Sequence, residues 1–137
     1  MVASRSHWAM SPMTGDRRGD GHWISPSAFV SGRVVHMRNG GDVAVLCGYA
    51  RDGDVHTLLT QVAHLTRNGN QAFILLADFN RSPSDLVGIE WLERLRAEIV
   101  LPENAEITCH MGQGSLIDYI LCSKAVRPYI RSLLTFP

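Results

Sequence analysis

The sequence of 137 residues lacks several features that would assign a protein to a class. It has no apolar run approaching the roughly 20 residues of a membrane span, and no N-terminal basic region followed by such a run. Neither charge is in excess, because 13 Lys and Arg face 13 Asp and Glu. General attraction to nucleic acid is therefore absent, and a local patch would have to bind it. We expect a soluble intracellular protein, nuclear or cytoplasmic, with no membrane partner.

Cysteine is scarce and odd in number. Cys47, Cys109 and Cys122 lack the paired spacing of a metal site, and they lie in apolar stretches. We expect three small buried hydrophobic residues in a reducing compartment.

The N-terminal stretch lacks any apolar period. Residues 1 to 24 mix Gly, Ser, Arg and Asp, so residues 1–28 are expected to be a disordered leader before one domain that covers 29–137. The tripeptide Arg18-Gly19-Asp20 is similar to an adhesion ligand, but three matching residues in such a leader are usually chance.

From Phe29 onward, strand-like and helix-like patterns alternate. Asn39-Gly40 is a short hairpin signal between two β-branched stretches, and Asp54 and Gly69 are start and stop signals around a helical apolar period. The stretch "AFILLAD" is apolar on both faces, as in a central strand. The predicted order is ββαβαββ, an α/β sandwich with strands 29–37, 42–49, 72–78, 105–110 and 116–122 and helices 54–68 and 82–99.

Four polar residues resist a purely structural explanation. Asp78 and Asn80 end the apolar strand and, two residues apart, share a face, although Asp78 could also form a turn or cap a helix. Asp118 lies in the apolar stretch "SLIDYILC", where a carboxylate needs a partner, and a structural ion pair is the alternative. Tyr49 ends the second strand and could equally be an aromatic residue at the edge of the core.

Together these residues resemble a known family. "LLADFNRSP" and "GSLIDYILCS", in this order, and "VLCGYARDG" before them are similar to segments of the endonuclease/exonuclease/phosphatase superfamily. That superfamily comprises metal-dependent phosphodiesterases, among them abasic-site endonucleases, DNase I-like enzymes and retrotransposon endonucleases. The resemblance covers about residues 29 to 135, with Ala77 in place of the usual glycine. It implies part of a DNase I-like four-layer α/β sandwich with mixed, largely antiparallel sheets.

The resemblance also implies roles for individual residues. Asp78 would orient or deprotonate the attacking water, Asn80 would hold the water or a phosphate oxygen, and Tyr49 would donate to the phosphate. Asp118 would orient the histidine of the family, and Ser115 would support the loop and help to bind the substrate. Phosphodiester hydrolysis needs a base, donors to the phosphoryl oxygens and a hard cation, so Mg²⁺, or Mn²⁺ in its place, is the expected cofactor of the complete domain.

Two parts of the family pattern are missing from this chain. The metal-binding glutamate and asparagine of the N-terminal half and the late histidine have no counterparts, so the chain resembles the later part of such a domain, cut at both ends. We therefore expect doubtful metal binding and no appreciable activity. His110, on a Gly-rich loop before Asp118, is a candidate substitute but is more commonly a solvated histidine, and His56 and His64 are expected to face solvent.

Three functions stay open at this stage. The first is part of a Mg²⁺-dependent hydrolase, a nuclease of retrotransposon type that acts on DNA. The second is a non-catalytic remnant or interaction module. The third is a phosphatase of the same superfamily that acts on phosphoinositides or other phosphate esters.

Overall fold

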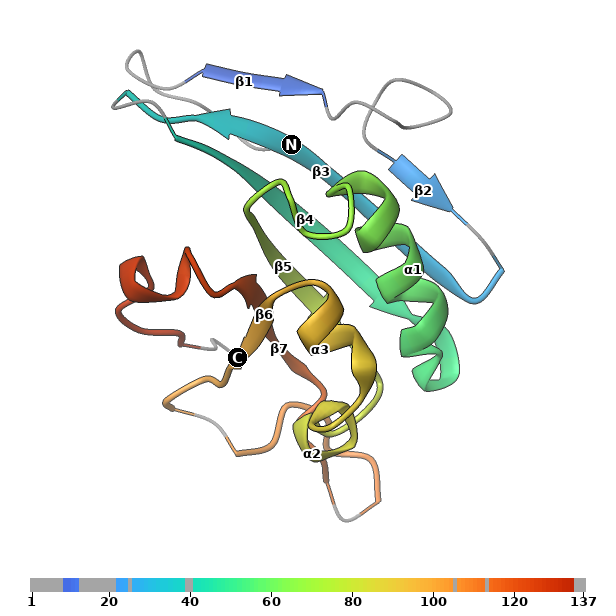
Figure 1. The fold of residues 1–137 in the computed structure, drawn as a ribbon. Helices are drawn as coiled ribbons and strands as arrows, with labels where there is room; N and C mark the ends of the chain where they lie inside the picture. Colours follow the sequence, from blue (N-terminus) through green and yellow to red (C-terminus); the bar gives the residue numbers. More distant parts are fainter. Residues whose placement is uncertain are drawn as a thin grey trace.

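The strands of this chain pair into one mixed β-sheet, and its helices cover one face of that sheet (Figure 1). The computed structural model describes residues 9–12, 22–24, 26–38, 41–104, 106–112 and 114–134. Its elements are β1 (Ala9–Pro12), β2 (His22–Ile24), β3 (Ala28–His36), β4 (Asp42–Ala50), the 3-10 turn η1 (Arg51–Gly53), α1 (Val55–Leu65), β5 (Phe73–Asp78), α2 (Pro83–Leu86), α3 (Glu90–Arg94), β6 (Ala97–Val100), β7 (Asp118–Ser123) and the 3-10 turn η2 (Arg127–Tyr129). The strand order is β1-β3-β4-β5-β7-β6, and β2 also pairs with β3.

The first long strands form the predicted hairpin. β3 and β4 pair antiparallel along their whole length, with Phe29 opposite Tyr49. The hairpin prediction is confirmed for both strands, whereas the Asn39-Gly40 turn lies outside the described residues.

Helix α1 connects two parallel strands. The Asp54 carboxylate accepts the Thr57 backbone N–H at 3.1 Å, which caps the helix where the sequence predicted its start. The helix then returns the chain so that β5 pairs parallel with β4, the one parallel pair among the described strands. It packs closely on the sheet, because a Cβ at Gly48 would stand 3.0 Å from the Leu58 side chain. The mixed, largely antiparallel α/β class is thus the observed one.

The prediction of one helix over residues 82–99 is wrong. Two short helices, α2 and α3, occupy this region, and residues 97–100 form strand β6 instead. The helix is interrupted where Val87 is extended and Gly88 has a φ of +87°. Arg96, with a φ of +50°, then turns the chain into β6, whose backbone groups pair with β7. The apolar spacing came from two separate turns that bury Leu86 and Leu95.

The predicted strand over 105–110 is also absent from the described part of that range. Residues 108–112 and 114–115 belong to a loop, in which an isolated bridge joins Cys109 and Ser115. The strand predicted over 116–122 is confirmed as β7.

The two faces of the sheet differ in how far they are covered. On one face, α1, α2 and α3 bury a continuous core that includes fully buried Leu58, Leu75 and Phe79. On the other face, Phe29 and Leu76 are exposed to solvent by 38% and 42% of their surface. The C-terminal segment covers part of this second face, where it packs on the side of β7 that carries Cys122. No helix in the described residues is long and apolar enough to cross a membrane.

The prediction that all three cysteines are buried is wrong. Cys122 is buried, Cys109 is half-buried and Cys47 is exposed. The apolar stretch around Cys47 supplies both faces of β4, and Cys47 alternates onto the face that the helices do not cover.

The stretch predicted as a leader contains two short strands. β1 pairs antiparallel with β3 over Ala9–Pro12, and β2 pairs with it over His22–Ile24. This differs from the expectation of a leader without regular structure. The strands can form because the backbone groups along the free edge of β3 are available for pairing. Residues 1–8, 13–21 and 25, with the Arg18-Gly19-Asp20 tripeptide, lie outside the described residues.

Candidate active site

Three of the residues singled out in the sequence form one row across the sheet. Tyr49 of β4 lies opposite Asp78 of β5, and Asp78 lies opposite Asp118 of β7. Tyr49 is near the end of its strand, Asp78 ends β5, and Asp118 begins the antiparallel β7, so all three meet at the same edge. The expectation that Tyr49 and Asp78 share one end of one sheet is confirmed. The opposition of Asp118 to Asp78, forty residues away in the chain, was not predicted.

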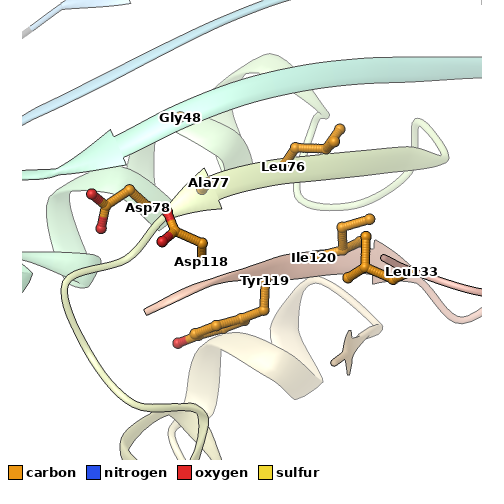
Figure 2. Close-up of a pocket in the computed structure, with 8 residues that line it drawn as sticks. All are labelled: Gly48, Leu76, Ala77, Asp78, Asp118, Tyr119, Ile120 and Leu133. Atoms are coloured by element: carbon orange, nitrogen blue, oxygen red, sulfur yellow. The ribbon is translucent and has the colours of Figure 1, made fainter. Parts of the chain in front are cut away.

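An open pocket of about 310 Å³ lies beside this row (Figure 2). Its lining is apolar along β5 and β7 and acidic at the strand ends, where the two carboxylates lie side by side (Figure 2). The lining residues are Gly48, Leu76, Ala77, Asp78, Asp118, Tyr119, Ile120 and Leu133. A small polar molecule could therefore reach both carboxylates from solvent.

Asp78 has the turn-forming role that the sequence left open, and only one of its two carboxylate oxygens is used for it. Its Oδ1 accepts the Asn80 backbone N–H at 2.9 Å, which makes it a turn-forming aspartate. The structure gives its other oxygen, Oδ2, no hydrogen bond from any described residue. Partial burial raises the pKa of the carboxyl above its ordinary value, the Asn80 N–H bond works in the opposite direction, and the nearby Asp118 charge raises the pKa further. One oxygen thus holds the turn, and the other is available to a water molecule.

Asn80 holds the chain in a sharp turn at the end of β5. Its φ of +48° is in the left-handed region, where asparagine is tolerated better than most residues. Its side-chain Nδ2 donates to the Ala50 carbonyl at 2.8 Å, which joins the ends of β4 and β5. The amide is therefore beside the row, and part of its hydrogen-bonding capacity is used by the backbone.

The turn after Asp78 is fixed to β7 by contacts that sequence reasoning missed. The Phe79 N–H donates to the Ile117 carbonyl at 2.8 Å. The Phe79 ring stacks on Tyr119 at 4.3 Å between centroids, and the Tyr119 hydroxyl donates to the Arg81 carbonyl at 3.0 Å. Burial raises the pKa of Tyr119 well above its usual range, so it stays a neutral donor. Alternation was the available signal, because it places Phe79 and Tyr119 opposite to the faces of Asp78 and Asp118.

Asp118 is not in the structural ion pair that the sequence left as an alternative. It is half-buried on the open side of β7, and no described residue forms a salt bridge with it. An ion pair elsewhere in the described residues joins His36 and Asp42. A carboxylate that faces a second carboxylate and has no paired cation in the described structure is unfavourable for folding, and such groups gather at functional sites.

The remaining candidates lie farther from the row. Ser115 is in the loop before β7, where its backbone pairs with Cys109, and its hydroxyl has no hydrogen bond to the described residues. His110 is exposed on the same loop, and no described contact brings it to Asp78. His56 and His64 are exposed on α1, as predicted.

The described residues do not by themselves make a metal site. No group of three or more His, Cys, Asp and Glu side chains among them is placed to hold an ion. Asp78 and Asp118 offer two carboxylates, whereas a protein-bound Mg²⁺ completes six positions with further ligands and water.

Comparison with known proteins finds similarity at the level of structure. No protein-family model matches the chain, and no curated protein matches it by sequence. The solved structures similar to it include the catalytic domain of human Nocturnin with a bound sulfate anion, at 14% identity and a TM-score of 0.49, covering 85% of this chain and 46% of that one. The Haemophilus ducreyi cytolethal distending toxin matches at 14% identity and a TM-score of 0.49, covering 90% and 45%.

A third match is an endonuclease/exonuclease/phosphatase family protein from Bacteroides thetaiotaomicron, at 14% identity and a TM-score of 0.44, covering 71% of this chain and 42% of that one. A protein of the superfamily that the sequence motifs resemble is thus among the structures similar to this chain. The chain spans less than half the length of these structures, with 46%, 45% and 42% of them covered. At TM-scores below 0.5, neither activity nor substrate transfers from them to this chain.

Proposed function

We propose that the row of Tyr49, Asp78 and Asp118, with Asn80 beside it, is the water-activating and phosphate-binding part of a phosphodiesterase site, and that DNA is its substrate. The observation that supports this most is the pair of facing carboxylates at an open pocket, with no cation from the described residues beside them. Like charges directly opposite in a sheet are unfavourable, so a protein keeps them where they serve chemistry.

Asp78 is the proposed general base. Asp78 lines the pocket, and its Oδ2 accepts no hydrogen bond from the described residues, while Oδ1 is held by the Asn80 N–H, which fixes the orientation of the carboxylate. A pKa raised by burial and by Asp118 makes this carboxylate a stronger base than an exposed aspartate. It would take the proton of the water that attacks phosphorus, while the bond from phosphorus to the leaving oxygen breaks.

Tyr49 and Asn80 are the proposed partners of the phosphate and the water. Tyr49 is 42% exposed, so its hydroxyl can donate to a phosphoryl oxygen of a bound substrate. Asn80 uses one amide hydrogen on Ala50, which leaves its other hydrogen and its Oδ1 for the water. Ser115 would support the loop on which substrate rests.

Charge in the pocket supports a need for a cation. Asp78 and Asp118 are both acidic, and a phosphodiester brings a further negative charge, so substrate binding beside them is opposed unless positive charge is present. Mg²⁺, or Mn²⁺ in its place, is the proposed cofactor, and when bound it would neutralise charge on the phosphoryl oxygens. Because no group of three His, Cys, Asp or Glu side chains is present among the described residues, water and other oxygen ligands would have to complete its coordination.

The 137-residue chain is expected to have no appreciable nuclease activity. A positioned base contributes about 10² to 10⁴ in rate, far below what phosphodiester hydrolysis needs. Residues that act as a unit lose activity together, so Asp78, Asn80 and Asp118 should not keep a proportionate share of the rate.

Substrate binding gives the direct test of the proposed site. NMR amide shifts of the chain would be followed while a short DNA duplex is added with Mg²⁺. We expect perturbation centred on residues 49, 78, 80 and 118, weakened by Tyr49→Phe and dependent on the metal. Perturbation elsewhere, or none with DNA, would overturn the assignment, and a response to a phosphate monoester alone would redirect it to a phosphatase.

A cleavage assay tests the expected inactivity separately. Supercoiled, abasic-site and single-stranded DNA would be incubated with the chain and Mg²⁺ or Mn²⁺, beside Asp78→Ala. Metal-dependent cleavage that Asp78→Ala abolishes would contradict the expected inactivity while supporting the site, with His110 as the first residue to examine.

A second candidate, a non-catalytic interaction module, has one observation in its favour. Oδ1 of Asp78 and Nδ2 of Asn80 both serve the backbone of the turn, as they would in a purely structural motif. This function predicts that neither DNA nor a phosphate ester perturbs the row in the NMR titration.

A further inference from the structure

One hydroxyl group lies at the point where the loop before β7 meets the candidate site. Thr108 Oγ1 accepts the backbone N–H of Ile117 at 2.9 Å and the backbone N–H of Asp118 at 3.1 Å. Thr108 is half-buried, and its own N–H donates to the Ser115 carbonyl at 2.9 Å, which closes the loop. A single side chain thus holds two successive amides.

These two amides are at a critical position in the sheet. Asp118 begins β7, and its pairing with Asp78 is the last pair of the β5–β7 ladder, where strands commonly fray. The Ile117 carbonyl, in the same peptide segment, accepts the Phe79 N–H next to Asp78. The Thr108 hydroxyl is therefore hydrogen-bonded directly to the backbone that carries Asp118. Through the hydrogen bond between Ile117 and Phe79, it is also connected to the backbone next to Asp78.

The other contacts around Ile117 and Asp118 do not replace the hydrogen bonds that the Thr108 hydroxyl accepts. Phe79 and Tyr119 stack beneath the turn and fix the opposite side of the two strands. No described side chain pairs with the Asp118 carboxylate, so its position depends on its backbone. Without the Thr108 acceptor, two partly buried N–H groups would lose their partner, which favours opening of this segment toward water.

We infer that Thr108 is a positioning residue that holds Asp118 opposite Asp78, and so maintains the facing pair of carboxylates; its importance for reaction rests on the proposed function. Thr108 itself is not expected to touch the substrate. A residue that only stabilises the loop would leave the interaction between the two carboxylates unchanged.

The two interpretations differ in a measurable way. Thr108→Val keeps the shape of the side chain and removes the acceptor, and Thr108→Ser keeps the acceptor. Carboxyl ¹³C shifts of Asp78 would be followed by NMR across the acidic range in the wild type, in both Thr108 variants, and in Asp118→Asn. Amide hydrogen exchange at residues 117 and 118 would be measured on the same samples, and at residues 79 and 119 as an internal check of folding.

Thr108→Val is expected to shift the Asp78 titration midpoint downward, toward the midpoint found in Asp118→Asn, and to speed exchange at 117 and 118 at least several-fold. Thr108→Ser should restore both values. In the Asp118→Asn background, Thr108→Val should no longer move the Asp78 midpoint, because the partner charge is already gone.

An unchanged Asp78 midpoint in Thr108→Val, or an equal change in the Asp118→Asn background, would overturn the positioning role. Should Thr108→Val fail to fold, Thr108→Ser decides, since loss of the wild-type midpoint despite a retained hydroxyl would also overturn it. None of these readouts needs catalysis or DNA binding. If the positioning result holds and the DNA titration shows no response at the row, the proposed function fails and Thr108 keeps its role in the carboxylate pair.

Discussion

Replacing Asp78 by asparagine should make this protein more stable at neutral pH. Asparagine has nearly the same shape, and its Oδ1 can still accept the Asn80 N–H that Asp78 accepts at 2.9 Å. What the substitution removes is the ionised carboxylate, which burial and the facing Asp118 both disfavour. A functional carboxylate would then lower the stability of the fold that carries it.

The sign and size follow from linkage. The folded-state pKa of Asp78 is raised above its ordinary value of 3.8, so the folded state holds the proton more tightly than the unfolded state. Stability from this group is present below the unfolded pKa and is lost as pH rises through the folded pKa. Like charges directly opposite in a sheet lower the free energy of unfolding by about 0.2 to 1 kcal/mol. Because Asp78 is partly exposed, solvent screening keeps its effect within that range.

Urea unfolding at low protein concentration measures the effect. We expect Asp78→Asn to raise the free energy of unfolding by about 0.2 to 1 kcal/mol near pH 7 and to leave it almost unchanged near pH 3, where the wild-type carboxyl is protonated in both states. Asp118→Asn should give a gain of the same sign, and the double variant should gain less than the sum, because either substitution removes the repulsion.

A clear result against this reasoning is available. If Asp78→Asn were less stable than the wild type near pH 7, the ionised carboxylate would be stabilising the fold. If the gain were as large near pH 3 as near pH 7, its origin would not be charge.

Three further perturbations have separate physical causes. Asp54→Ala should lower the free energy of unfolding by about 1 kcal/mol, because α1 loses its N-terminal cap. Hydrogen bonds with Thr57 lower the pKa of Asp54, so this loss should shrink as pH falls through the lowered pKa. Urea unfolding at several pH values measures both effects. Tyr119→Phe should cost about 1 kcal/mol and speed amide exchange at Arg81, because the hydroxyl bond to its carbonyl is lost; unchanged exchange would show that the bond does not hold the turn. The chain should associate as its concentration rises, because the sheet face with Phe29 and Leu76 is uncovered, and a monodisperse monomer in light scattering with a cooperative thermal transition would contradict this.

Local patterns determined much of the fold from the sequence. The β3–β4 hairpin, the start of α1 at Asp54 and the strand that ends in Asp78 each depend on signals within a few residues. The parallel pairing of β4 with β5 likewise follows from the helix that connects them. These features were predictable because the interactions that cause them are close in the chain.

Local patterns failed where tertiary contacts decided between alternatives. Residues 82–99 carry apolar spacing that suits one helix, yet pairing with β7 draws 97–100 into a strand and leaves two short helices before it. Cys47 has apolar neighbours like those of Cys122, but only Cys122 lies under the C-terminal segment. Composition cannot distinguish two faces of a strand when only one of them is covered.

The candidate site divides in the same way. The sequence by itself determined which residues are candidates for the site, since Tyr49, Asp78 and Asp118 are polar residues in or at the ends of apolar strands. Only the tertiary structure decided that β7 rather than β6 lies beside β5, which places Asp118 opposite Asp78 and brings the Thr108 hydroxyl to the backbone that carries Asp118. The physical reason is that strand order is set by which faces can be buried together across the whole sheet, and that free energy is not contained in any one segment of the chain.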